Sequence, residues 1–308
     1  MHALHPLLSG FAPIWALTGV GYLVGRSGLL GPQAEAVLSR FVFHVAMPAA
    51  LFLMIARTPL ERFANASMLA FAAGTAFATG LGLLAGRLLF HRKPGELAIG
   101  GMAAGYVNSA NLGIPVAMQV LGDASFVAAV VLFQILFVTP AVLAVLDGRG
   151  AGLRALLTLP LRNPVLLATA LGAVASATGL HLPAELNHSC ELLGGAGVPT
   201  ALIALGISLH NRPPADAGSR RAEVGLTVLV KTLVQPLAAY AVAAFVLHLP
   251  PHQLLTVVLF SALPTAQNVY VYAREYGQGT ALARDAVLWS TLVSMATLSV
   301  ISWSLGSA

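Results

Sequence analysis

The chain has 308 residues, of which 9% are charged and 57% are hydrophobic, and its formal net charge is +5. Soluble domains carry roughly 25% charged residues, so this composition excludes a soluble protein, which needs a charged surface. The positive charge comes from arginines in loops rather than from a basic patch with interleaved aromatic residues, so no nucleic-acid partner is implied.

Ten apolar stretches are long enough to cross a bilayer. A membrane-spanning helix needs about 20 mostly apolar residues, because its backbone polar groups must all be satisfied within the segment. Short polar or Pro/Gly-containing joints separate the stretches. The sequence therefore predicts an all-α membrane protein with ten spans, at approximately 7–27, 34–56, 66–90, 96–121, 124–147, 163–180, 186–210, 222–248, 252–274 and 281–305.

The cationic residues predict the orientation, because short cytoplasmic loops retain Lys and Arg. The opposite side holds only Arg57 and Arg62. We therefore expect both termini outside, in the plasma membrane (the inner membrane of a bacterium). The joints on the inner side hold Arg26, Arg87, Arg92, Lys93, Arg149, Arg154, Arg162, Arg212, Arg220, Arg221, Arg274 and Arg284.

The two halves of the chain are weakly similar at a constant offset of 151 positions. Pro13 and Pro48, for example, correspond to Pro164 and Pro199, and Gly28, Leu29 and Pro32 have similar counterparts. Each half holds five spans, and an odd number inserts the second half from the opposite face. This predicts a 5+5 inverted repeat, residues 1–150 and 151–308, a design that recurs in secondary transporters with the site at mid-membrane.

Spans four and nine are both interrupted near their centres by prolines, glycine, hydroxyls and amides. Proline removes a helix hydrogen bond, and glycine permits unusual backbone angles. Interruptions at matching places in two halves point to a carrier's binding site. The candidate substrate-binding residues are Asn108, Ser109, Asn111, Gly113 and Pro115 in span four, and Pro264, Thr265, Gln267 and Asn268 in span nine.

A helix broken at mid-membrane exposes backbone N–H groups and the positive end of a helix dipole. In an inverted repeat, two such ends face each other and favour an anion. We therefore expect two crossing broken helices that bind a small organic anion. The alternative is a pair of proline kinks whose amides only mend the backbone and bond neighbouring helices.

At these residues the chain resembles the auxin efflux carrier family in its short prokaryotic form. The resemblance rests on NSANLGIP in span four, on the proline-centred break of span nine, on KTLVQP from Lys231 to Pro236, and on WSTLVSMATLS from Trp289 to Ser299. It covers nearly the whole chain. The long hydrophilic central loop of the plant members is absent.

The resemblance implies a fold similar to that of bile acid–sodium symporters. Spans 1, 2, 6 and 7 would form a scaffold, and spans 3–5 and 8–10 a moving transport unit. It also implies that Asn108, Asn111, Pro115 and Pro264 border the substrate, that malonate or a related carboxylate is carried, and that the protein forms a homodimer.

Three further polar residues lie inside predicted spans. Lys231 is near the midplane, where a charge is costly and therefore a functional candidate; it could attract the substrate or replace a coupling cation, or else snorkel to the surface. His44 could relay a proton, although an interhelical hydrogen bond is the preferred interpretation. Gln134 could face the site or bond neighbouring helices.

A secondary carrier is the leading interpretation, and no cofactor is expected. The sequence lacks a zinc-protease motif, paired intramembrane carboxylates and a phosphate-binding loop, which disfavours an enzyme or a primary pump. The only cysteine, Cys190, allows no disulfide framework or cysteine-based metal cluster. A membrane-embedded sensor remains an alternative. Coupling stays open between uniport, sodium symport and proton coupling.

Overall fold

The protein is helical throughout the regular parts that the structure describes. The computed structural model describes residues 4–57, 65–113, 116–117, 120–122, 125–147, 164–180, 182–210 and 217–305. Within these ranges no β-strand forms, and only an isolated β-bridge joins two extended segments. The helices, of which those named η are short π-helical segments, are α1 (Leu4–Ser27), α2 (Ala34–Phe41), η1 (Val42–Ala46), α3 (Met47–Ala56), α4 (Ala66–Leu88), α5 (Pro94–Gly105), η3 (Ser109–Gly113), α7 (Ser125–Phe133), η4 (Gln134–Val138), α8 (Thr139–Asp147), α10 (Pro164–Thr178), α11 (Ala184–Gly195), α12 (Gly197–His210), α13 (Ala217–Leu229), η5 (Val230–Val234), α14 (Gln235–Ala241), η6 (Val242–Val246), α15 (Pro251–Ser261), α16 (Gln267–Glu275) and α17 (Thr280–Leu305).

Six continuous helices in the described part of the chain are long and apolar enough to cross a membrane. This confirms an all-helical protein of membrane composition. The predicted spans at 34–56, 66–90 and 281–305 agree with these helices to within two residues. Predicted spans four and nine consist of shorter helices, since both are interrupted. The six helices are Ala34–Ala56, Ala66–Leu88, Ala129–Leu146, Ala184–His210, Arg220–Val246 and Thr280–Leu305.

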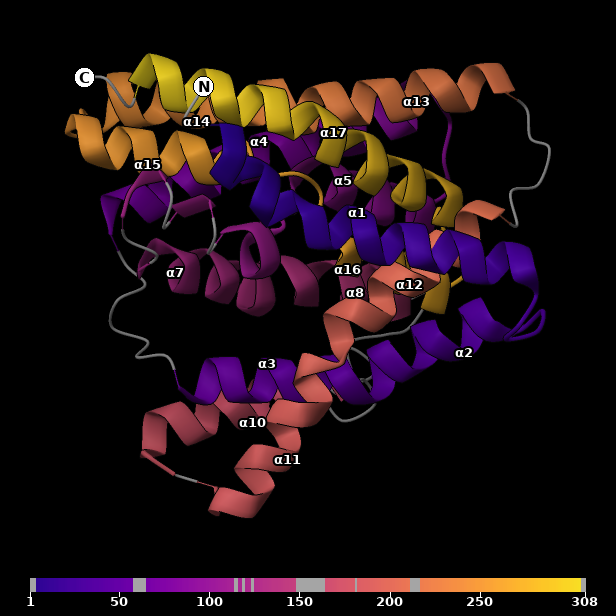
Figure 1. The fold of residues 1–308 in the computed structure, drawn as a ribbon. Coiled ribbons are helices and arrows are strands. Elements are labelled where there is room, and N and C mark those ends of the chain that lie inside the picture. The colour runs from indigo at the N-terminus through magenta and orange to yellow at the C-terminus, as the bar shows by residue number, and fades with distance from the viewer. Residues whose placement is uncertain are drawn as a thin grey trace.

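The helices form two groups with the interrupted segments between them. Figure 1 shows α2, α3, α10 and α11 on one side, and α4, α13, α14, α15 and α17 on the other. Helices α5, α7 and α16 lie between these groups, and α1 packs along α12. The interrupted segments are therefore enclosed by helices, as non-helical backbone in a membrane must be.

Two close helix contacts depend on glycine. A Cβ on Gly21 would collide with the backbone oxygen of Ile203, so α1 and α12 touch backbone to backbone. A Cβ on Gly172 would lie 2.9 Å from the backbone oxygen of Phe52, so α10 and α3 also pack closely. Small residues are the usual means of tight helix packing in membranes, where burial of apolar surface drives association little.

Three of the π-helical segments end two residues before a proline. η1 precedes Pro48, η4 precedes Pro140 and η5 precedes Pro236. Proline cannot donate the i→i−4 hydrogen bond and its ring crowds the preceding turn, and a widened turn accommodates both effects. Single π turns occur often at functional sites. Here the three segments contain His44, Gln134 and Lys231, the three polar residues predicted inside the spans.

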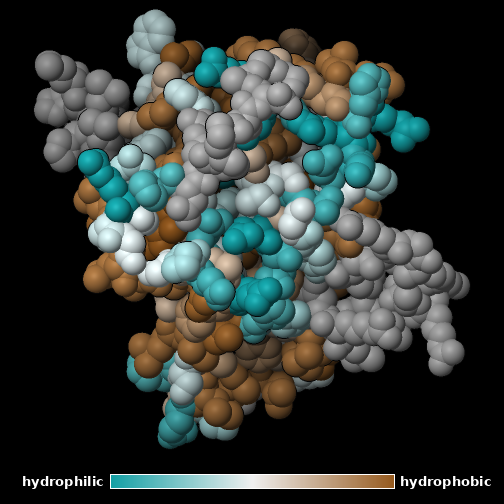
Figure 2. Space-filling model, turned by 90° about the vertical axis from the view of Figure 1, so that its right-hand side faces the viewer, coloured by the Kyte–Doolittle hydropathy of each residue, from teal (hydrophilic) through white to brown (hydrophobic). Residues whose placement is uncertain are grey.

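Hydrophilic residues gather at one end of the helix bundle. Figure 2 looks onto the right-hand end of Figure 1, where α1 ends and where α2, α13 and α17 begin. Teal residues occupy the middle of this face, and hydrophobic residues lie around its sides. Arg26 lies in the last turn of α1, and Arg220 lies near the start of α13. This end thus presents a polar surface bordered by apolar helix walls.

Candidate functional site

The two interrupted helices meet and pair through their backbones. α5 ends at Gly105, and the chain is extended from residue 106 to 108 before η3 begins. α15 ends at Ser261, and α16 begins only at Gln267. Val107 and Thr265 form an antiparallel bridge at this place. The predicted interruptions are present, although the first begins at Tyr106, ahead of the glycine and proline expected to cause it.

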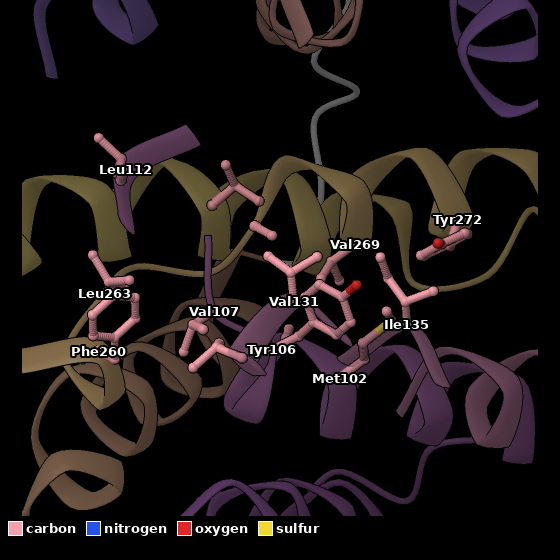
Figure 3. Close-up of a cluster of buried hydrophobic side chains, with 14 of the residues drawn as sticks. Met102, Tyr106, Val107, Leu112, Val131, Ile135, Phe260, Leu263, Val269 and Tyr272 are labelled. Carbon is pink, nitrogen blue, oxygen red and sulfur yellow. The ribbon is translucent and has the colours of Figure 1, made fainter. Parts of the chain in front are cut away.

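Two hydrogen bonds hold the paired segments together. The N–H of Asn108 donates to the carbonyl oxygen of Pro264 over 2.8 Å, and the N–H of Ala266 donates to the carbonyl oxygen of Tyr106 over 3.2 Å. Backbone N–H and C=O groups that lose their helical partners at one interruption thus bond to backbone groups of the other interruption. This avoids the cost of unpaired buried backbone groups. Figure 3 shows Tyr106 and Val107 among the buried side chains of both interrupted segments.

Gln134 completes the hydrogen bonding of Val107. Its Oε1 accepts from the Val107 N–H over 2.6 Å, and its Nε2 donates to the Val107 carbonyl oxygen over 3.1 Å. The same Nε2 donates to Ser109 Oγ over 3.0 Å. Gln134 therefore acts as a clasp, a side chain that holds the extended segment by hydrogen bonds, and it also lines the cavity described next.

A small cavity of ≈ 40 Å³ lies between α3 and the paired segments. Helix α3 contributes Leu51 and Met54, and the α7–η4 region contributes a third wall. Three of the predicted substrate-binding residues at the interruptions line it. They are Asn108, Ser109 and Asn268. Asn108 and Ser109 are buried, and Asn268 is half-buried. This cavity is the candidate substrate site, since amides and a hydroxyl converge on it.

Other predicted site residues lie around the crossing rather than in the cavity wall. Thr265 turns away from it, because its Oγ1 donates to Ala103 O over 2.7 Å and its N–H donates to Ser290 Oγ over 3.0 Å. Pro264 and Gln267 are buried beside it. A Cβ on Gly113 would lie 3.2 Å from a ring carbon of Phe260, so glycine there lets η3 pack closely on α15. The side chain of Asn111 and all of Pro115 lie outside the described residues.

Lys231 is fully buried and does not line the cavity. Its relative exposure is 0%, which contradicts the snorkelling alternative. Nζ donates to Gln235 Oε1 over 2.7 Å and to the carbonyl oxygen of Ser261 over 3.0 Å. Gln235 in turn donates from Nε2 to the carbonyl oxygen of Gly105 and to Thr75 Oγ1, both over 3.1 Å. Lys231 thus contacts the crossing at the end of α15, and it is absent from the cavity lining.

Charged side chains join α2 and η1 to α16, and the sequence analysis missed their role. His44 Nε2 lies 3.1 Å from Glu275 Oε1, so this histidine bonds a neighbouring helix, as preferred from the sequence. Glu35 pairs with Arg274 over 2.8 Å and accepts a hydrogen bond from Tyr270 over 2.7 Å. The signal available was the opposite charge of Glu35 and Arg274 at span ends on the same predicted side.

A second charged pair lies deeper than expected. Arg284, which the sequence places at an inner joint, and its neighbour Asp285 are each only 4% exposed. Arg284 Nε contacts Asp285 Oδ1 over 2.8 Å, and Nη1 donates to the Ser208 carbonyl oxygen over 3.1 Å. Both residues lie at the start of α17, as expected, but Arg284 is bonded to the end of α12, where a cation complements the helix dipole.

Comparison with known proteins identifies the class of protein to which this chain belongs. The family described as "Membrane transport protein" matches residues 6–302, nearly the whole chain. The chain therefore belongs to this family of membrane transporters, which includes the auxin efflux carriers. It is a multi-pass membrane protein.

The relatives include proteins named for transport. The "Putative malonate transporter" of Rhizobium meliloti (strain 1021) is 29% identical over 299 residues, covering 93% of this chain and 92% of that protein. "Uncharacterized transporter YfdV" of Escherichia coli (strain K12) is 25% identical over 296 residues, 91% of each chain. "Auxin efflux carrier component 3a" of Oryza sativa subsp. japonica is 29% identical over 139 residues, 44% of this chain and 22% of that protein.

Proposed function

We propose that the protein is a secondary carrier that moves a small carboxylate, malonate or a close relative, by alternating access at the cavity between α3 and the crossing. The pairing of Val107 with Thr265 carries this proposal. It brings the start of α16 and the amides of Asn108 and Asn268 to one small cavity. Amide donors and a helix N-terminus favour negative charge, and a relative at 29% identity is named for malonate transport.

An inverted repeat of residues 1–150 and 151–308 is part of this proposal. Gly172 and Ile203 follow Gly21 and Phe52 by the same 151 positions that separate the paired prolines, and they make the corresponding helix contacts. Ten spans with both termini outside, and a homodimer formed through the scaffold, complete the proposal.

Alternating access would separate a scaffold from a transport unit. The scaffold would be α1–α3 and α10–α12, and the remaining helices would move against it. A cavity of ≈ 40 Å³ has room for about three waters, which is less than a dicarboxylate needs. Leu51 and Met54 on α3 must therefore move away from the crossing for substrate to enter. The contacts of Glu35 with Arg274 and of His44 with Glu275 join the two units at one end.

Uptake of labelled malonate into proteoliposomes tests the proposal. Asn108→Ala and Asn268→Ala should each lower uptake roughly 10- to 100-fold, because a hydrogen bond to a charged group contributes about 1.5–3 kcal/mol. Gln33→Ala is the matched control, since Gln33 is exposed and its side chain caps no helix. Control and wild type should transport equally.

A thermal-shift screen tests the charge of the substrate independently. Small carboxylates should raise the Tm of the purified protein, and the Asn268→Ala variant should respond less. Strong stabilisation by a cationic or neutral solute, with none by any carboxylate, would refute an anion site.

A further inference from the structure

The ammonium group of Lys231 lies at the C-terminal ends of both interrupted helices. Ser261, whose carbonyl oxygen it contacts, is the last residue of α15. Gly105, the last residue of α5, is reached through Gln235, because the amide of Gln235 accepts from Lys231 and donates to Gly105. One buried cation and one amide therefore serve both helix ends.

The electrostatics of this place favour a cation. The C-terminal end of a helix carries a partial negative charge, from carbonyl groups that have no partner within the helix. Two such ends meet here, and a third carbonyl nearby, that of Ala103, is taken by Thr265. The contacts of Lys231 with Gln235 and Ser261 are to neutral oxygens, so helix dipoles and carbonyl oxygens compensate its charge.

These ligands are the kind that a carrier offers to a coupling ion. In discontinuous transport helices, half-helix C-terminal ends and unwound carbonyls coordinate sodium, while half-helix N-terminal ends face the anionic substrate. In this chain the cavity lined by Asn108 and Asn268 lies between the crossing and α3. The C-terminal ends of α5 and α15 have the ammonium group of Lys231 beside them instead of a free sodium ion.

We propose that Lys231 permanently fills the position of a coupling cation, so that substrate binding and transport require no sodium. This inference rests on the proposed carrier function and assigns its mode of coupling. Lys231 acts as a positioning residue, because it touches the ends of the helices that shape the cavity rather than the cavity itself. Its charge holds α5 and α15 in the geometry that bound sodium would otherwise impose.

The first experiment uses the wild-type protein. Its stabilisation by malonate and its malonate uptake are measured in sodium and in N-methyl-D-glucamine at equal ionic strength. We expect the two media to give the same Tm shift and the same uptake rate. Malonate binding that requires sodium would overturn this inference and leave the carrier proposal intact. Absence of stabilisation by any carboxylate in either medium would overturn both.

The second experiment removes the charge but keeps an oxygen ligand. Lys231→Gln should reduce malonate uptake at least about tenfold without sodium and recover part of it with sodium. The purified variant should gain roughly 2 °C or more in Tm from sodium, as a ligand that binds the folded state does. Lys93→Gln, a change at an exposed loop lysine, is the control and should show neither effect.

A Lys231→Gln variant that transports malonate at the wild-type rate without sodium would refute the assigned role. So would a folded variant that loses uptake and responds to no small cation, because the lysine would then contribute something other than its charge. If the variant does not fold, the comparison of media with the wild type decides the matter alone.

Discussion

Replacing Gln134 with leucine should destabilise the crossing more than any change of similar size at the surface. The substitution removes three hydrogen bonds, with Val107 N–H at 2.6 Å, Val107 O at 3.1 Å and Ser109 Oγ at 3.0 Å. The Ser109 hydroxyl can rotate to another acceptor. The Val107 N–H cannot, because this residue is 1% exposed and its extended backbone is fixed by the bridge to Thr265. The Val107 carbonyl oxygen keeps a partner, since it also accepts from the Ser109 N–H over 2.9 Å.

The expected loss of stability follows from the unpaired Val107 N–H. A buried donor left without a partner costs about 1–3 kcal/mol, so Gln134→Leu should lose about 1–3 kcal/mol of unfolding free energy. Unfolding of the purified protein in detergent measures the difference, and Gln33→Leu is the control at an exposed glutamine. Malonate should also stabilise the variant less, since Gln134 lines the cavity. A loss below about 0.5 kcal/mol, equal to the usual effect of a surface change, would refute the clasp.

Two further predictions concern helix packing and a loop ion pair. Gly21→Ala should lower unfolding free energy by about 1–3 kcal/mol by overpacking against α12, whereas Gly19→Ala, with open space around it, should change it little; equal Tm values would contradict the contact. Glu223→Gln breaks a 2.6 Å pair with Arg92 at a carboxylate only 5% exposed, so it should lower Tm clearly more than Glu185→Gln at an exposed site. Because Glu223 raises the pKa of Arg92 above its ordinary value, the pair's stabilisation is present below that value and should persist as pH rises through the alkaline range. A loss of the difference between these variants near neutral pH would contradict this.

The extent of the helices could be read from the sequence because it depends on local properties. Apolar runs such as 34–56 must be helical in a bilayer, since the helix is the conformation in which a single segment satisfies its own backbone hydrogen bonds. The interruptions near Asn108 and Pro264 were predictable for the same reason, because glycine, proline and amides disturb helix hydrogen bonding only within a few residues of their own position. The π turns around His44, Gln134 and Lys231 were not anticipated, although each lies just before a proline.

The candidate site was predictable only in part. Asn108, Ser109 and Asn268 line the cavity, and all were chosen because they flank a break. Thr265 was chosen for the same reason, yet it bonds α5 and α17 instead. The rotation of a broken helix about its axis decides which side a residue faces. This rotation cannot be predicted from how close the residue lies to the break.

By itself, the sequence determined the class of protein, the helical segments and the two places where helices break. Tertiary structure alone decided that Val107 pairs with Thr265, that Gln134 holds this pair, and that Lys231 reaches the helix ends rather than the membrane surface. The physical reason is that the solvent around the helices is lipid rather than water. Lipid is as apolar as the protein interior, so a membrane helix shows only a weak hydrophobic stripe to mark its buried face. Its orientation is fixed by close packing and a few polar contacts between distant segments.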